Sequence, residues 1–262
     1  MDKNLRQIKC FMIDMDGTFY LGNHLLPGAL EFMEFIKRQG IDYLFLTNNS
    51  SKNKQIYAQK MQKMGVFVDE NKVFTSGEAT IIYLKKNTTF KRIYLVGTPA
   101  LEEEFIRAGF FLCEEHPDAV VLGFDTTLTY EKIWKVCNLV REGFPYIATH
   151  PDYNCPTESG FMPDIGSFIA MIEASTGRRP DIIIGKPYRH IVDAVVEKTG
   201  FMLSEIAMVG DRLYTDVALG RVGITTILVL SGETKRKDLT NSEFQPDYIF
   251  ENLAELVGYL KN

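Results

Sequence analysis

The sequence lacks the patterns that characterise several large classes of protein. Its 29 Lys and Arg residues are outnumbered by 34 Asp and Glu residues, which gives a formal net charge of −5, whereas a nucleic-acid-binding protein needs a basic face. No apolar run approaches the roughly 18 residues of a membrane-spanning helix, and no basic segment followed by an apolar run opens the chain. We therefore expect a cytoplasmic protein that binds neither nucleic acid nor a membrane.

Common cofactor and nucleotide motifs are also missing. The sequence suggests neither a zinc site nor a disulfide framework, because no C-x-x-C pair occurs among Cys10, Cys113, Cys137 and Cys155. Neither the dinucleotide-binding pattern G-x-G-x-x-G nor the Walker A pattern is present. The chain has 262 residues, of which 45% are hydrophobic and 24% charged, so it can fold as an ordinary globular enzyme with room for a second domain.

Strand and helix patterns alternate along the chain. Apolar runs of strand length, such as 41–46 and 206–209, are followed by helical patterns. Because parallel strands are joined by right-handed helical crossovers, this rhythm predicts an α/β protein with a parallel sheet. The middle of the chain has its own alternation and is long enough for a domain. We predict a core of residues 1–80 and 181–262 that is interrupted by an inserted α/β domain, residues 81–180.

The first apolar run ends in two carboxylates. Residues 8–13 are mostly apolar and lead into Asp14-Met15-Asp16-Gly17-Thr18. Buried parallel strands are apolar runs of this kind, and open α/β sheets bind ligands at the carboxyl ends of their strands. Two neighbouring acids repel each other and lose hydration when buried, so a divalent cation or a phosphate reaction would account for the pair. A polar turn after an ordinary strand is the plainer interpretation.

Other apolar segments also end in polar groups that phosphate chemistry can use. These groups are Thr47 with Asn48, then Lys186, and finally Asp211 with Asp216. A parallel sheet would bring all of them to one edge together with the two acids. Phosphoryl transfer needs charge neutralisation as well as a nucleophile, and Mg²⁺ takes oxygen ligands. Taken singly, each group has a plainer interpretation as a helix N-cap, a solvated lysine or a charged helix start, so only the joint pattern favours a site.

The joint pattern resembles the four motifs of the haloacid dehalogenase-like phosphatases. Residues 14–18 resemble their opening D-x-D-G-T motif, and Thr47-Asn48-Asn49 is similar to the second motif. Lys186 is similar to the third motif, and residues 210–216 to the fourth. The order and the long gap before Lys186 are similar to the NagD and 4-nitrophenylphosphatase-like group. The resemblance covers essentially the whole chain and implies a Rossmann-like core with an inserted C2-type cap domain.

The resemblance implies a Mg²⁺-dependent phosphomonoester hydrolase that acts through an aspartyl-phosphate intermediate. Its substrates would be small phosphorylated metabolites, such as sugar phosphates or nucleoside monophosphates. Asp14 would be the nucleophile, and Asp16 would be the general acid and then the general base. An Asp14 oxygen, the main-chain carbonyl of Asp16 and the Asp211 side chain would hold the metal ion.

The resemblance also implies a set of groups that bind the phosphoryl oxygens. Thr47 would act through its hydroxyl and Asn48 through its main-chain amide, with Asn49 in the same motif. Both would lie just before a helix, where free N–H groups favour anions. Lys186 would neutralise the phosphate and the nucleophile together, and Asp216 would orient a water molecule or Lys186.

Substrate specificity would come from the cap, which in the resembled group contacts the leaving group of the substrate. In that group the cap also often takes part in a homodimer. The loop from Thr149 to Asp164 has the composition of a substrate-facing element, although its prolines equally suit a rigid connector. The group usually has asparagine where His150 stands, so His150 receives no role. Two alternatives remain, a phosphotransferase or mutase and a non-catalytic phosphometabolite-binding module. Retention of both Asp14 and Asp16 weighs against the second.

Overall fold

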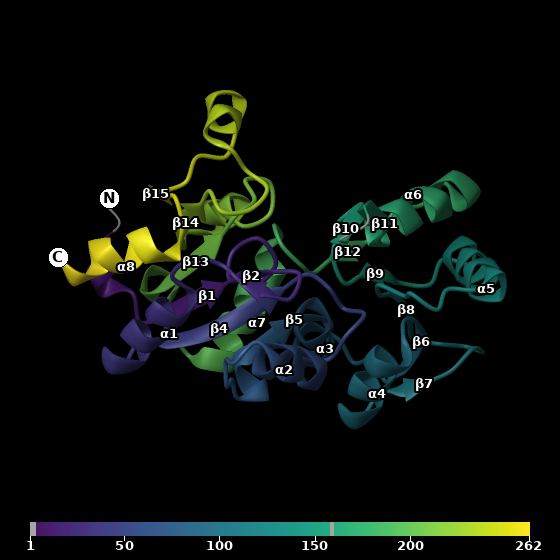
Figure 1. Ribbon diagram of the computed structural model, residues 1–262. Coiled ribbons are helices and arrows are strands. Elements are labelled where there is room, and N and C mark those ends of the chain that lie inside the picture. Colours follow the sequence, from purple (N-terminus) through teal and green to yellow (C-terminus); the bar gives the residue numbers. More distant parts are fainter. Residues whose placement is uncertain (1–3, 158–159) are drawn as a thin grey trace. The chain divides into compact units, whose positions relative to one another are not determined.

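The computed structural model describes residues 4–157 and 160–262, and these residues pack into two compact units (Figure 1). Unit 1 comprises the residues up to Thr47, then Tyr57–Phe74 and Val195–Asn262. Unit 2 comprises Asn48–Ile56 and Thr75–Ala194. Each unit is therefore built from segments that are far apart in the sequence.

Unit 1 is organised around a six-stranded sheet in the order β15-β14-β13-β1-β4-β5. Its strands are β1 (Cys10–Ile13), β4 (Asp42–Thr47), β5 (Val73–Thr75), β13 (Ile206–Gly210), β14 (Thr225–Val229) and β15 (Tyr248–Phe250). Strand β1 pairs in parallel with both β13 and β4, and β14 pairs in parallel with β13 and β15. All four residues of β1 are buried, as expected for a central strand that is covered on both faces.

Two helices of unit 1 pack closely together beside this sheet. Helix α1 (Ala29–Arg38) contacts both α8 (Leu253–Lys261) and β4. Gly28 precedes α1 with a positive φ of 84°, and a Cβ there would lie 2.0 Å from the main-chain nitrogen of Ala254. Only glycine permits this close approach. Short 3₁₀ helices complete the unit: η1 (Leu5–Gln7), η2 (Glu70–Lys72), η3 (Leu203–Glu205), η4 (Val217–Val222) and η5 (Arg236–Asn241).

Unit 2 contains a second parallel sheet, in the order β12-β9-β8-β6-β7. Its strands are β6 (Arg92–Val96), β7 (Phe111–Leu112), β8 (Ala119–Leu122), β9 (Tyr146–Ala148) and β12 (Ile182–Ile183). Its helices are α3 (Ser76–Asn87), α4 (Pro99–Arg107), α5 (Tyr130–Arg141) and α6 (Ile165–Thr176). The side chains of Thr98, Thr129 and Asp164 accept hydrogen bonds from the first turns of α4, α5 and α6, which fixes where each helix begins. Helices α2 (Lys54–Lys63) and α7 (Arg189–Thr199) include residues of both units.

The predicted α/β architecture with parallel sheets is confirmed, and several local expectations are corrected. Part of the segment 149–164 forms an antiparallel hairpin rather than a loop, with strands β10 (Asn154–Thr157) and β11 (Gly160–Pro163). A second small hairpin joins β2 (Tyr20–Leu21) to β3 (His24–Leu25). The hairpin of β10 and β11 is largely exposed, so its sequence carries no apolar alternation that would indicate a strand.

Thr47 and Asn48 were expected to lie just before a helix, but they do not directly precede one. Helix α2 begins only at Lys54, and the Asn53 side chain accepts a hydrogen bond from the Ile56 N–H in its first turn. The plainer interpretation of Asp216 as a charged helix start matches a short 3₁₀ helix, η4, because Asp216 is its N-cap residue. Among the described residues, no helix combines the length and the apolar composition that a membrane span requires.

Candidate active site

A tight turn at the end of β1 positions the two acids of the first motif. The Asp14 N–H donates to the Val209 carbonyl at 2.8 Å, so Asp14 still follows the ladder to β13. The chain then reverses at Gly17, whose φ is +89°, and the N–H groups of Phe19 and Tyr20 return to the Met15 carbonyl. Asp14 is half-buried, whereas Asp16 is exposed. The same motif therefore places its two carboxylates in different environments.

Three carboxylates converge in unit 1. Asp14 follows β1, and Asp211 and Asp216 follow the neighbouring β13; one carboxylate oxygen of each lies within 4.8 Å of the others. Asp211 and Asp216 are each 1% exposed. Buried like charges at this separation repel each other, and hard oxygen donors are the ligands that Mg²⁺ prefers. The residues present therefore fit a divalent cation. The resemblance gave Asp216 an orienting role and did not count it among the metal ligands. Its carboxylate lies in the same cluster as those of Asp14 and Asp211.

Two glycines leave the space that the Asp211 carboxylate occupies. A Cβ at Gly17 would lie 2.4 Å from Asp211 Oδ2, and a Cβ at Gly232 would lie 2.0 Å from the same atom. The Glu233 N–H donates to Asp211 Oδ2 at 2.7 Å, and the Thr18 hydroxyl donates to Asp211 Oδ1 at 3.4 Å. Sequence analysis did not identify Gly232 or Glu233. Their position directly after β14 could have indicated both residues, because β14 ends at the same edge of the sheet as β13.

A half-buried arginine side chain, Arg212, lies close to the acids. Burial disfavours the charged form of Arg212, but the nearby Asp14, Tyr214, Asp211 and Glu233 side chains favour it, and the net effect raises the pKa of the Arg212 guanidinium. Arg212 Nε lies 3.0 Å from Glu233 Oε2. Arg212 therefore remains a permanent positive charge that offsets part of the acidic group.

The exposed acid of the first motif has a different neighbour. Lys60 Nζ lies 3.9 Å from Asp16 Oδ1 and also 3.9 Å from the centre of the Tyr20 ring. Burial, followed by the charges of Asp16, Tyr57 and Asp14, raises the pKa of the Tyr20 hydroxyl. The Tyr20 hydroxyl therefore stays protonated near neutral pH, and Lys60 is the cation beside Asp16. Sequence analysis gave no role to either residue.

Thr47 is the member of the second motif that belongs to unit 1. It is the last residue of β4, which pairs with β1 on the side opposite β13, with Phe45 opposite Ile13. Its side chain is buried. Thr47 therefore ends at the same sheet edge as Asp14, as the parallel arrangement predicted.

Asn48 and Lys186, both predicted to bind the phosphoryl group, meet in unit 2, although 138 positions separate them in the sequence. The Lys186 N–H donates to Asn48 Oδ1 at 2.8 Å, and Asn48 Nδ2 donates back to the Lys186 carbonyl at 3.0 Å. Asn48 Nδ2 also donates to Asp152 Oδ1 at 3.0 Å. A Cβ at Gly185 would lie 2.6 Å from both Asn48 Oδ1 and His150 Cβ, so glycine is required there. The Asn48 side chain thus fixes the main chain of Lys186, which is only 3% exposed.

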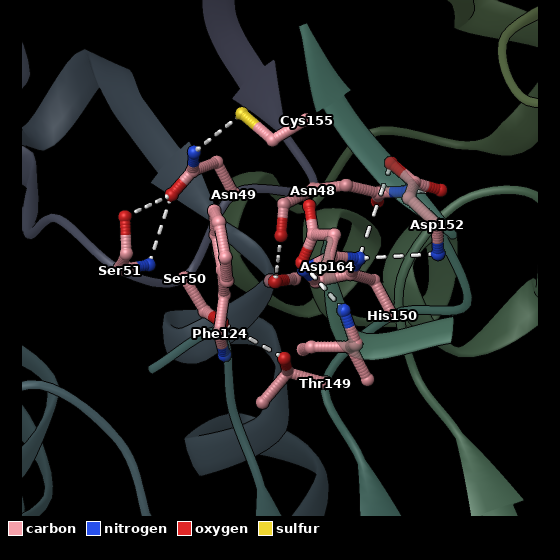
Figure 2. A network of polar contacts seen from close by, with 12 residues as sticks. Asn48, Asn49, Ser50, Ser51, Phe124, Thr149, His150, Asp152, Cys155 and Asp164 are labelled. Carbon is pink, nitrogen blue, oxygen red and sulfur yellow. Dashed lines mark hydrogen bonds and ion pairs between the residues drawn. The ribbon is translucent and has the colours of Figure 1, made fainter. Parts of the chain in front are cut away.

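Asn49 shapes the turn that follows. Its Oδ1 accepts hydrogen bonds from the Ser51 N–H at 2.9 Å and from the Ser51 hydroxyl at 2.7 Å, and its Nδ2 donates to Cys155 Sγ at 3.7 Å (Figure 2). These contacts give the Asn49 side chain a structural task in unit 2. Its part in substrate binding stays a prediction.

His150, which the sequence left without a role, is completely buried in the same network (Figure 2). Its Nδ1 accepts the Asp152 N–H at 3.3 Å, so the neutral ring carries its proton on Nε2, 3.4 Å from Asp164 Oδ1. Burial lowers the pKa of His150 to about 4, with a smaller lowering from Lys186 and an opposing effect of Asp152. The imidazole is therefore neutral near pH 7 and lies between the loop at Asp152 and Asp164, which precedes α6.

The sheet topology and the acidic group define an α/β enzyme whose ligand site lies at the carboxyl ends of parallel strands. Residues 11–111 match the family model described as haloacid dehalogenase-like hydrolase, and residues 183–256 match one described as HAD-hydrolase-like. The acid sugar phosphatase of Staphylococcus aureus (strain MRSA252) is 36% identical over 259 residues, which are 98% of this chain and 100% of that protein. The chain belongs to the haloacid dehalogenase-like hydrolases.

Solved structures show which group within this family the chain is similar to. The 4-nitrophenylphosphatase from Thermotoga maritima has a TM-score of 0.93 and 53% identity, with 96% of this chain and 97% of that chain covered. NagD from E. coli K-12 has a TM-score of 0.89 and 35% identity, with 95% and 98% covered. These similarities confirm the resemblance to the NagD and 4-nitrophenylphosphatase-like group, and the protein is a phosphatase.

Proposed function

We propose that the protein is a Mg²⁺-dependent phosphomonoesterase that hydrolyses small phosphorylated metabolites through an aspartyl-phosphate on Asp14. The observation that carries this proposal is the convergence of the Asp14, Asp211 and Asp216 carboxylates in unit 1. Sugar phosphates and nucleoside monophosphates are the substrate class we propose. The name of the acid sugar phosphatase that matches the whole chain supports the sugar phosphates.

Asp14 and Asp16 would divide the chemistry between them. An Asp14 oxygen attacks phosphorus while the bond from phosphorus to the ester oxygen breaks, and Asp16 donates its proton to the departing oxygen. Asp16 then takes a proton from water, whose oxygen attacks the aspartyl-phosphate and releases inorganic phosphate together with the Asp14 carboxylate. The exposure of the Asp16 side chain is consistent with a proton carrier that both substrate and water must reach.

The metal ion would be held by Asp14, Asp211 and the main-chain carbonyl of Asp16. Asp216 lies close enough to share in holding the ion or its waters. When bound, Mg²⁺ would neutralise part of the negative charge on the phosphoryl oxygens. Arg212 would limit the repulsion among the acids before the ion binds, because its positive charge lies next to them.

Thr47, Asn48, Asn49 and Lys186 are the residues we propose for binding the phosphoryl group. Thr47 would donate its hydroxyl, Asn48 its main-chain N–H, and Lys186 would supply a positive charge. The paired hydrogen bonds between Asn48 and Lys186 support this assignment, because they hold the second and third motifs in a fixed arrangement. We further propose that residues 81–180 form the cap. Its part in a homodimer and the cytoplasmic location remain predictions.

The test is hydrolysis of 4-nitrophenyl phosphate and of a panel of sugar phosphates and nucleoside monophosphates. We expect turnover with Mg²⁺, loss of turnover with a chelator, and a loss of at least ~10³-fold in Asp14→Asn, since the nucleophile is removed. Circular dichroism should show that the variant remains folded. Full activity in folded Asp14→Asn would refute the nucleophile assignment. Transfer of phosphate to an added sugar, measured against release of free phosphate, would favour the phosphotransferase alternative.

A further inference from the structure

A short loop after β14 contacts the acidic group of unit 1. This 231–234 loop, Ser231-Gly232-Glu233-Thr234, lies against both turns that carry the acids. The Ser231 hydroxyl donates to the Gly17 carbonyl at 2.9 Å. The N–H groups of Glu233 and Thr234 donate to the side chain and the carbonyl of Asp211, at 2.7 and 3.2 Å. The loop therefore supplies a short hydrogen bond to the Asp211 carboxylate.

The Glu233 side chain has partners of its own. Its Oε1 accepts the Tyr214 hydroxyl at 2.9 Å, and its Oε2 faces Arg212 Nε at 3.0 Å. Both partners come from the segment that directly follows Asp211. The main chain of Glu233 thus holds the carboxylate of Asp211, while its side chain is anchored to the next residues of the same segment.

We propose that Glu233 is a positioning residue, whose anchored side chain keeps its N–H on Asp211 Oδ2 and so fixes how Asp211 faces the metal ion. One Asp211 oxygen is oriented by this bond, and Thr18 contacts the other at 3.4 Å. Groups that orient a metal ligand commonly change metal affinity about 10- to 100-fold when they are removed. The inference rests on the proposed function, in which Asp211 is a ligand of Mg²⁺.

Loss of the Glu233 carboxylate has a second consequence in the same direction. Arg212 would lose its partner at 3.0 Å while Asp14 and Asp211 remain nearby. The guanidinium would then be drawn towards these acids and would compete with the cation for them. Both effects weaken metal binding, and neither removes a group that would react with substrate.

The test is direct measurement of Mg²⁺ binding to the full chain by isothermal titration calorimetry, without substrate. Glu233→Ala keeps the main-chain N–H and removes only the anchor, so we expect its Kd for Mg²⁺ to rise about 10- to 100-fold. At saturating Mg²⁺ its kcat for 4-nitrophenyl phosphate should return close to that of the unmodified protein. Tyr214→Phe, which removes one of the two partners of the Glu233 carboxylate, should raise the Kd less than Glu233→Ala.

Glu243 provides the matched control. It also pairs with an arginine, Arg221, at 2.8 Å, but both side chains are well exposed. We expect Glu243→Ala to leave the Kd for Mg²⁺ unchanged. If Glu233→Ala has the Kd of the control, the inference is overturned and the proposed function stands. If the unmodified protein neither binds Mg²⁺ nor turns over any phosphate ester, the proposed function fails and the inference fails with it.

Discussion

Replacing the buried His150 should change how stability depends on pH. Burial lowers the pKa of His150 from 6.5 to about 4. Below pH 6.5 the unfolded chain therefore binds a proton that the folded chain takes up only near pH 4. The free energy of unfolding should consequently fall as the pH decreases through this window. The difference between the two pKa values corresponds to a loss of about 3 kcal/mol by pH 4, with no loss above pH 7.

His150→Asn removes this titration and keeps an oxygen that can accept the Asp152 N–H. We expect the free energy of unfolding of the variant, relative to the unmodified protein, to rise by about 3 kcal/mol between pH 7.5 and pH 4. Asp152, Asp164 and Lys186 face His150 and are present in both proteins, so comparing the two proteins removes most of their contribution.

Urea denaturation at several pH values, with a chelator present, measures this difference. His24→Asn is the control, because His24 is exposed. The stability of this variant should follow that of the unmodified protein at every pH. Parallel pH curves for His150→Asn and the unmodified protein would refute the reasoning, because they would show that burial does not hold the imidazole neutral.

Two further predictions concern Glu104 and Gly232. Burial and then the charge of Glu78 raise the pKa of Glu104 to about 7, against a lowering by the Lys54 N–H. Glu104 thus stabilises the fold below pH 4.5, and this contribution is lost as the pH rises through 7. The free energy of unfolding of Glu104→Gln, relative to that of the unmodified protein, should therefore rise by about 3 kcal/mol between pH 4.5 and pH 8.5 in urea denaturation. No relative rise would contradict this prediction. Gly232→Ala should weaken Mg²⁺ binding about 100-fold in calorimetry, because its Cβ would lie 2.0 Å from Asp211 Oδ2; an unchanged Kd would show that the loop can move aside.

The sequence was sufficient for the parts of the site that depend on strand ends. Asp14 and Asp211 each follow a buried apolar run, and parallel pairing of β1 with β13 brings such ends together. The same parallel pairing predicts the position of Thr47, because β4 pairs in parallel with β1 and ends at Thr47. For these residues, local pattern and tertiary arrangement depend on the same cause, the burial of a parallel strand on both faces.

The groups that the sequence did not reveal depend on packing between distant segments. Glu233 reaches Asp211 only because β14 is the neighbour of β13, and apolar periodicity does not give strand order. His150 becomes a buried neutral base through the packing of Asp152, Asp164 and Gly185 around it. The hairpin of β10 and β11 was missed because its strands are mostly exposed, so no apolar alternation marks them.

The central claim is that Asp14 carries the phosphoryl group during turnover. Its most direct test is mass spectrometry of the enzyme after acid quenching during hydrolysis of 4-nitrophenyl phosphate. The account predicts a phosphorylated peptide modified at Asp14, and no modification in Asp14→Asn. A phosphoryl group on another residue, or rapid turnover with no phosphorylated enzyme trapped at any quench time, would contradict the account.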